Sequence, residues 1–325
     1  MSAKTIGGWT EDFHRRRVDP LFPAFTGAAS AFPSTFSRTF SKTTTDAGPQ
    51  TLNFIHGMKC GGGLGEWGSI VIDAQPPVIK SSGIVSASGF GQFASVAPGS
   101  WIEIYGSNLS ATSRSWADAD FLGVNAPTSL DSTAVKIGGQ SAFIDYVSPS
   151  QVNAQVPSNV PLGSQTVTVT TSVGTSPPLP VNVNVIQPGL NAPPSFIIGG
   201  KQYVAALFAD GFTYVLPTGA IPGVASRRAK VGETIVLYGV GFGPVTPTLP
   251  AGQVVLLANS LIAPLQVSFG PVKATVLFAG LVSGSIGLYQ FNVIVPNVVP
   301  NDAVPLTFTV GAVAGTQTLF IAIQN

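Results

Sequence analysis

From residue 76 onward, the chain consists of short segments in which apolar and polar residues alternate, separated by glycine, proline and asparagine. Successive side chains of a strand point to opposite faces, so this alternation predicts strands with one buried face. No stretch of a dozen residues carries apolar positions at the 3.6-residue period of a helix. The pattern therefore predicts an all-β fold made of short strands.

The pattern repeats along the chain. The segment 98–106, PGSWIEIYG, returns as VGETIVLYG at 231–239. Further matches follow in the same order, namely 135–138 with 267–270, 142–146 with 274–278, 151–157 with 290–296, and a strand at Thr166 to Thr170 with one at Pro305 to Thr309. Because the order is kept across several strands, the sequence predicts two repeated modules.

The alternation also predicts which side chains are buried in each copy. Ile102 and Ile104 point to one face of their strand and Glu103 to the other, and Ile235 and Leu237 take the matching positions in the second copy. A unit of about 100 residues with about seven short strands is typical of an immunoglobulin-like β-sandwich. We therefore expect two such modules in tandem, preceded by a weakly structured N-terminal segment.

These patterns set the expected domain boundaries. The predicted parts are a partly irregular N-terminal segment at 1–75, the first module at 76–187, a linker with a β-hairpin at 188–222, and the second module at 223–325. The hairpin is expected to join Val204 to Ala209 with Phe212 to Leu216 through a type I′ turn at Asp210-Gly211.

Composition excludes several classes of protein. The chain has 15 basic and 14 acidic residues and only 9% charged residues, so it lacks the basic field that nucleic-acid binding requires. Glycine, proline or polar residues interrupt each apolar run before the roughly 18 residues that a membrane span needs. We predict no nucleic-acid partner and no membrane span.

The N-terminal segment contains both histidines and the single cysteine, Cys60. One cysteine cannot form a disulfide within the chain. The basic run Arg15 to Arg17 is followed by an apolar stretch that Asp19 and two prolines interrupt, so no export signal is evident in this sequence. The glycine cluster 61–65 lacks a following Lys-Ser or Lys-Thr, and we interpret it as a flexible connector.

The chemistry-bearing residues argue against an enzyme. His14 and His56 precede both modules, so neither module has a histidine base for a serine or cysteine nucleophile. One cysteine and two distant histidines do not match the spacing of a zinc site. We therefore predict no catalytic residues, no metal site and no cofactor.

Two places remain candidates for binding. Trp116, Asp118 and Asp120 lie in a long loop of the first module, where two carboxylates beside an aromatic ring suit calcium or sugar. The alternative is a loop whose tryptophan packs against the core. Trp101 lies on the polar face with Glu103, where it either covers the sheet or stacks on a sugar. The candidate binding residues are Trp101, Trp116, Asp118 and Asp120.

Paired amides recur in both copies. Gln151 and Asn153 share one strand face, as do Gln290 and Asn292, and we expect them to bond to neighbouring backbone groups. The acidic residues of the first module, which a hydrolase would use, are Glu103, Asp118, Asp120, Asp131 and Asp145.

The motifs APGS at 97–100, IYGSNL at 104–109, APTSL at 126–130 and YVSPSQVNAQVP at 146–157 resemble the uncharacterised Solibacter-type C-terminal domain family. The segments 232–243 and 287–293 extend this likeness to about residues 76–325. Each module separately resembles the IPT/TIG group of immunoglobulin-like domains. The resemblance implies an extracellular β-sandwich and carries over no catalytic residues.

Pattern and resemblance together predict a non-catalytic structural or interaction protein of the adhesion type, secreted or at the cell surface. Its expected partners are a protein, the extracellular matrix or a polysaccharide, and strand edges suit self-association. The first alternative is a carbohydrate-binding module of a secreted system. The second is a hydrolase that uses the loop carboxylates.

Overall fold

The computed structural model describes residues 6–7, 37–38, 50–56, 66–72, 75–87 and 93–325, and before residue 75 only the backbone is described. The chain divides into two compact units, Met1–Gln75 and Pro76–Asn325. His14, the basic run 15–17, Cys60 and the glycine cluster 61–65 lie outside the described residues. Among those described, no helix is long and apolar enough to cross a membrane.

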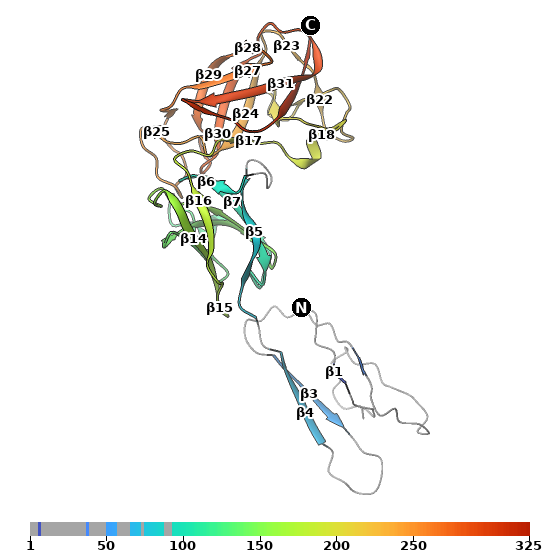
Figure 1. Cartoon of the computed structure of the whole chain (residues 1–325), viewed down its shortest axis with the longest axis vertical. Helices are drawn as coiled ribbons and strands as arrows, with labels where there is room; N and C mark the ends of the chain where they lie inside the picture. Colours follow the sequence, from blue (N-terminus) through green and yellow to red (C-terminus); the bar gives the residue numbers. More distant parts are fainter. Residues whose placement is uncertain (1–5, 8–36, 39–49, 57–65, 73–74, 88–92) are drawn as a thin grey trace, which may run out of the picture. The chain divides into compact units, whose positions relative to one another are not determined.

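The first unit contains paired strands that the sequence analysis did not predict. Strands β1 (Ile6–Gly7) and β2 (Ser37–Arg38) are antiparallel. Strands β3 (Gln50–His56) and β4 (Glu66–Ile72) pair along their full length, from Gln50 opposite Ile72 to His56 opposite Glu66 (Figure 1). This part of the segment, expected to be partly irregular, therefore contains a two-stranded sheet.

The second unit begins with a β-sandwich of two facing sheets, drawn in cyan and green in Figure 1. The first sheet has the order β5-β7-β13-β12-β8. Its strands are β5 (Val78–Ser86), β7 (Trp101–Ser107), β13 (Gln151–Gln155), β12 (Phe143–Val147) and β8 (Arg114–Ser115).

The opposite sheet has the order β11-β10-β14-β16-β6, with β9 beside β10 and β15 beside β14. Its strands are β11 (Gln140–Ser141), β10 (Thr133–Ile137), β14 (Gly163–Thr171), β16 (Leu179–Val183), β6 (Ser95–Val96), β9 (Ser129–Leu130) and β15 (Gly174–Thr175). Ile102 and Ile104 are 0% exposed, in one core cluster with Val135 and Val167 of this sheet. The predicted core face of β7 is thus confirmed.

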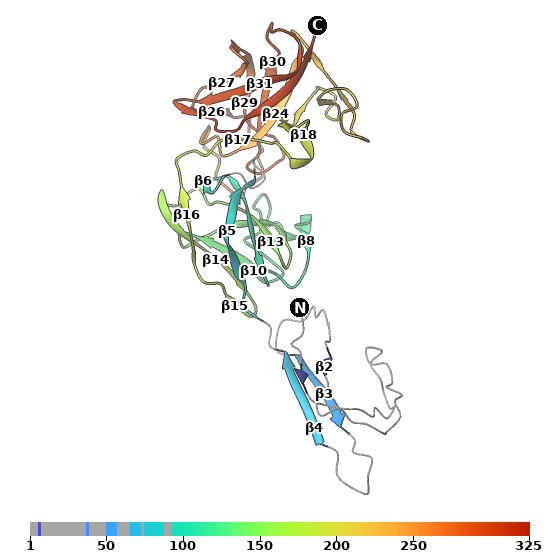
Figure 2. The same ribbon diagram turned by 45° about the vertical axis from the view of Figure 1, so that its right-hand side comes forward.

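A second sandwich, yellow to red in Figure 2, follows the first. One sheet has the order β22-β21-β20-β24-β30-β29 with β17 beside β24, and the other β23-β33-β31-β27-β28 with β32 beside β31. The strands of the first are β22 (Ser226–Arg227), β21 (Tyr214–Val215), β20 (Ala206–Leu207), β24 (Thr234–Val240), β30 (Tyr289–Ile294), β29 (Thr275–Leu281) and β17 (Gly189–Leu190). Those of the second are β23 (Ala229–Lys230), β33 (Leu319–Gln324), β31 (Asn301–Val310), β27 (Leu265–Phe269), β28 (Val272–Lys273) and β32 (Val313–Ala314).

Short elements complete the unit. They are the strand pairs β18 (Ile197–Ile198) with β19 (Lys201–Gln202) and β25 (Val245–Thr246) with β26 (Ser260–Leu261), and the 3-10 turns η2 (Asp118–Asp120) and η3 (Pro194–Phe196).

Matched residues take matched places in the two sandwiches. Ile104 lies opposite Val152 in the pair β7–β13, and Leu237 lies opposite Phe291 in the pair β24–β30. The register also shifts at the same place in both, after Ile144 in β12 and after Val276 in β29. The expected burial of Ile235 and Leu237 is confirmed, and the fold is all-β as predicted.

The predicted linker 188–222 is built into the second sandwich. Strands β17 and β20 both pair with β24, on the side of that strand opposite β30. The hairpin strands are shorter than expected, and the Asp210-Gly211 turn is not type I′. That turn needs positive φ at both central residues, whereas only Gly211 has it. Instead, the Asp210 carboxylate accepts hydrogen bonds from the amides of Phe212 and Thr213.

The two sandwiches meet at a hydrogen-bonded junction. The Gln155 side chain donates to the Gly99 carbonyl at 2.9 Å and accepts from the Gly252 amide at 2.6 Å. The Ala126 amide donates to the Gly252 carbonyl at 2.7 Å, and the Val254 amide to Val124 at 2.9 Å. The junction therefore joins two backbone segments, 124–126 and 252–254, that lie far apart in the sequence.

Close approach at this junction requires a glycine. Gly252 has φ +78°, and a Cβ there would lie 2.2 Å from the ring of Phe143 in the other sandwich. Such an overlap forces the two sandwiches apart or the ring out of place. The backbone of Gly252 is thus a contact point of the junction that a side chain would disrupt.

We expect Gly252→Ala to destabilise the chain by about 1–3 kcal/mol more than Gly219→Ala, because overpacking adds to the strain of an alanine at positive φ. Gly219 is the matched control, since it has φ +71° and nothing lies within 4 Å of a Cβ there. Urea unfolding followed by tryptophan fluorescence measures both. Equal losses in the two variants would contradict the importance of this contact.

Candidate functional site

A pocket of about 860 Å³ lies beside the junction and is lined by both sandwiches; we call it the junction pocket. From the first sandwich it is lined by Ala87, Trp101, Trp116, Ala117, Asp118, Phe121, Gly123, Asp145 and Asn153. From the second it is lined chiefly by Asn191, Val240, Val254, Gly284, Ser285, Ile286 and Leu288. The structure thus brings three of the four predicted site residues, Trp101, Trp116 and Asp118, to one cavity.

Three aromatic rings form part of the pocket wall. Trp116 contacts Trp101 edge-on, with centroids 5.6 Å apart and planes at 79°, and its centroid lies 4.9 Å from that of Phe121. The Trp101 Nε1–H donates to the Ile286 carbonyl of the second sandwich at 2.7 Å, which fixes its ring. Trp116 also packs against the core of the first sandwich. Trp116 therefore packs against the core, as one alternative predicted, and also lines the pocket.

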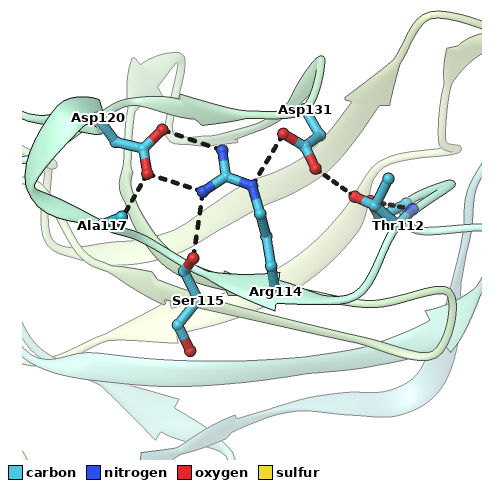
Figure 3. A network of polar contacts seen from close by, with 7 residues as sticks. Thr112, Arg114, Ser115, Ala117, Asp120 and Asp131 are labelled. Carbon is cyan, nitrogen blue, oxygen red and sulfur yellow. Dashed lines mark hydrogen bonds and ion pairs between the residues drawn. The ribbon is translucent and has the colours of Figure 1, made fainter.

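A cluster around Arg114 holds the loop that carries Trp116 (Figure 3). The guanidinium donates two hydrogen bonds to Asp120, at 2.7 and 2.9 Å, and one to Asp131 at 2.9 Å. Asp131 also accepts a hydrogen bond from the Thr112 hydroxyl, and the Ala117 amide donates to Asp120. The loop conformation therefore depends on interactions among its own side chains.

The Arg114 guanidinium lowers the pKa of Asp120 from 3.8 to about 2, and the Ala117 amide adds to this effect. Asp120 is thereby held as a carboxylate by its own loop and does not line the pocket. Asp118, in contrast, is exposed, lines the pocket, and its side chain makes no hydrogen bond to another described residue. The two acids that the sequence suggested as a pair therefore differ, since Asp120 stabilises the loop and Asp118 lines the pocket.

The division of the two acids also bears on calcium. Within the part of the chain that the structure describes, no three residues of the types His, Cys, Asp and Glu are grouped so that they could hold a metal ion. Both oxygens of Asp120 accept hydrogen bonds from Arg114, so this carboxylate is already engaged.

Asp145 on β12 is a pocket residue that the sequence analysis named only among the acids of the first module. Its Oδ1 atom is buried without a hydrogen-bond partner among the described residues. Burial is the main cause that raises its pKa from 3.8 to about 6; Asn153 opposes the rise, and the negative charge of Glu103 adds to it. Asp145 lies at the register shift of β12, so its orientation cannot be read from strict alternation.

Neighbouring polar side chains on the same sheet are mostly engaged with one another. The Gln151 amide donates to Asn153 Oδ1 at 2.8 Å, and Gln290 donates to Asn292 in the same way. The expectation that these amides bond to backbone groups is therefore wrong, because residues two apart on one strand face reach each other directly. The Tyr105 hydroxyl donates to Glu103, and burial together with that carboxylate raises the pKa of Tyr105 to about 12.

The pocket can pack against an apolar surface and exchange hydrogen bonds at its polar groups. Its acceptors are the carboxylates of Asp118 and Asp145, and Asn153, Asn191 and Ser285 add amide and hydroxyl groups. No lysine or arginine is among the residues that line it. The arrangement suits the binding of a ligand that carries no negative charge.

Comparison with known proteins locates one family within the chain. The IPT/TIG domain family matches residues 91–190, which include the aromatic wall, Asp118, Asp120 and Asp145. The Solibacter-type resemblance and a second module of the IPT/TIG family stay predictions. No curated protein matches the chain.

Several solved structures are similar over much of the chain. One is SGBP-B of the Bacteroides ovatus mixed-linkage glucan utilization locus in complex with a mixed-linkage heptasaccharide, at 13% identity and TM-score 0.33, covering 98% of this chain and 60% of that one. Domains 5–6 of the S-layer protein SbsC match at 12% identity and TM-score 0.25, covering 77% of this chain and 99% of that one. SbsC domains 4–9 match at 12% identity and TM-score 0.21, covering 90% and 36%. The chain thus spans 60% of the first structure and 36% of the last.

We expect Asp145→Asn to be more stable than the wild type at pH 7.5. The difference in the free energy of unfolding should reach about 3 kcal/mol, because each unit by which folding raises the pKa corresponds to about 1.4 kcal/mol. A folded-state pKa of about 6 against 3.8 means that the wild type loses stability as pH rises from about 4 to 6, because the folded chain holds this proton more tightly. The difference should vanish below about pH 4, where Asp145 is protonated in both states.

The control is Asp118→Asn, which removes the same charge from the same pocket at an exposed position and should change stability by less than about 0.5 kcal/mol. Urea unfolding between pH 3.5 and 7.5 measures both variants. An Asp145→Asn effect that does not depend on pH would contradict the assignment.

Proposed function

We propose that the chain is a non-catalytic binding protein that acts at the cell surface or outside the cell, and that its partner is a surface or matrix component. The observation that carries the proposal is the junction, where the Gly252 amide of the second sandwich donates to the Gln155 side chain of the first at 2.6 Å and the Ala126 amide donates to the Gly252 carbonyl at 2.7 Å. A binding surface built from both sandwiches keeps its geometry only if they do not move apart, and such preorganisation favours binding.

The side-chain chemistry supports binding over catalysis. Both histidines of the chain precede residue 76, so the sandwiches have no histidine base. In the hydrolase alternative, Asp118 and Asp120 would act as a pair, but Asp120 is bound to Arg114. The IPT/TIG match over residues 91–190 supports the same reading, because that region contains half of the residues that line the pocket, including its three aromatic rings.

The proposal predicts saturable binding of the purified full chain to cell-envelope or extracellular-matrix material of the cells that produce it, measured by co-sedimentation. Gly252→Ala should weaken this binding at least about tenfold, which corresponds to about 1.4 kcal/mol, because the overlap with Phe143 disturbs the junction. Gly219→Ala, which has the same backbone strain away from the junction, should bind as the wild type does.

Two outcomes would contradict the proposal. Absence of wild-type binding to both kinds of material would contradict the binding function. Release of soluble fragments from the sedimented material in proportion to protein added would contradict the non-catalytic part.

A further inference from the structure

We infer that the junction pocket is the binding site and that it takes an uncharged oligosaccharide, with Trp116 as the packing surface and Asp118, Asp145 and Asn153 as partners of its hydroxyl groups. This inference rests on the proposed binding function and names the class of ligand. Four features of the pocket lead to it, namely its size, its rings, its unpartnered acceptors and its charge.

The size of the pocket suits an oligosaccharide. Its volume of about 860 Å³ is at the upper end of the roughly 300–1,000 Å³ found for ligand sites, so more than one sugar unit fits. Both sandwiches supply walls, with Ser285 and Ile286 facing the aromatic side from the second. A ligand in the pocket would therefore contact both sandwiches, and the fixed junction keeps these two walls at a constant spacing.

The aromatic rings are held in place before a ligand arrives. Trp101 is fixed by its hydrogen bond to Ile286, and Trp116 is packed between Trp101 and Phe121. All three rings are only partly buried, so each keeps surface toward solvent. Rigid aromatic side chains bury large apolar area at little cost in conformational entropy, which favours packing against the C–H face of a sugar ring.

Two carboxylates of the pocket have oxygens to which no described donor is bound. Asp145 Oδ1 is buried and unpartnered, and the Asp118 carboxylate makes no hydrogen bond to another described residue. A buried acceptor without a hydrogen bond destabilises the protein, and a ligand that donates a hydrogen bond to it removes this cost. Sugar hydroxyls are such donors. Asn153, which already accepts from Gln151, also lines the pocket and can bind the same ligand beside Asp145.

The negative charge of the pocket favours neutral sugars over acidic ones. Asp118 and Asp145 line it, Glu103 lies close enough to act on Asp145, and no lysine or arginine lines it. An acidic sugar would meet only negative charge. A quaternary ammonium ion fits less well than a neutral sugar, because ring centroids 5.6 and 4.9 Å apart leave no space for a cation between the rings.

The test uses a pair of matched pocket variants of the full chain. Ala117 and Ala119 are both exposed and belong to the same loop, but only Ala117 lines the pocket. Ala117 has φ −133° and ψ 169°, an extended conformation that any residue adopts, and its contact to Asp120 uses its backbone amide. Ala117→Trp should therefore fill the pocket without disturbing the loop, and Ala119→Trp adds the same side chain outside it.

Isothermal titration calorimetry is carried out with four neutral hexasaccharides, namely cellohexaose, laminarihexaose, maltohexaose and mannohexaose, and with hexagalacturonate and choline. We expect at least one neutral hexasaccharide to bind with a Kd below about 1 mM, equivalent to about −4 kcal/mol. Ala117→Trp and Asp118→Asn should each weaken it at least about tenfold, whereas Ala119→Trp should stay within about twofold. Hexagalacturonate and choline should bind at least about tenfold more weakly.

The inference is overturned if no neutral hexasaccharide binds, if Ala117→Trp binds as tightly as the wild type, or if hexagalacturonate or choline binds best. Failure of the pocket is distinguishable from failure of the proposed function. If Ala117→Trp still sediments with surface material while no hexasaccharide binds, the pocket assignment is wrong and the binding function stands. If the wild type binds neither surface material nor sugar, both are wrong.

Discussion

The contact between the backbone of Gly252 and the ring of Phe143 is the constraint on which the site depends. Because no side chain separates them, residues 252–254 come close enough to pair with 124–126, and Gln155 can join Gly99 to Gly252. The same approach brings Ile286 within reach of the Trp101 indole. The pocket beside the junction exists because two sandwiches, each with its own core, are held at this short distance.

A second constraint comes from the strands themselves. The alternation that buries Ile102 and Ile104 places Trp101 and Glu103 on the opposite face of β7, next to Asn153 of β13. A sheet that faces its partner on one side thus presents aromatic and polar groups on the other. The register shift in β12 then brings Asp145 to this face, where regular alternation alone would not specify its direction.

Features of the fold that depend on neighbouring residues could be predicted from the sequence, whereas those that depend on distant residues could not. Period-two alternation is local, so the all-β fold and the buried positions Ile102, Ile104, Ile235 and Leu237 were predictable and are confirmed. The addition of β17 and β20 to β24, and the role of Gly252, depend on segments far apart in the chain. Trp101, Trp116 and Asp118 were selected by residue type, but their meeting in one cavity needs the folded chain.

The acids of the first sandwich show the same point in chemical terms. In sequence, Asp118 and Asp120 look equivalent, yet Arg114 binds one and leaves the other exposed to the pocket. Asp145 is different again, since its burial without a partner for Oδ1 works against the folded state at neutral pH. A stabilising carboxylate is one that the fold has already paired, as Asp120 is. Carboxylate oxygens that the fold leaves without a hydrogen bond, as in Asp118 and at Oδ1 of Asp145, are the ones available to a ligand.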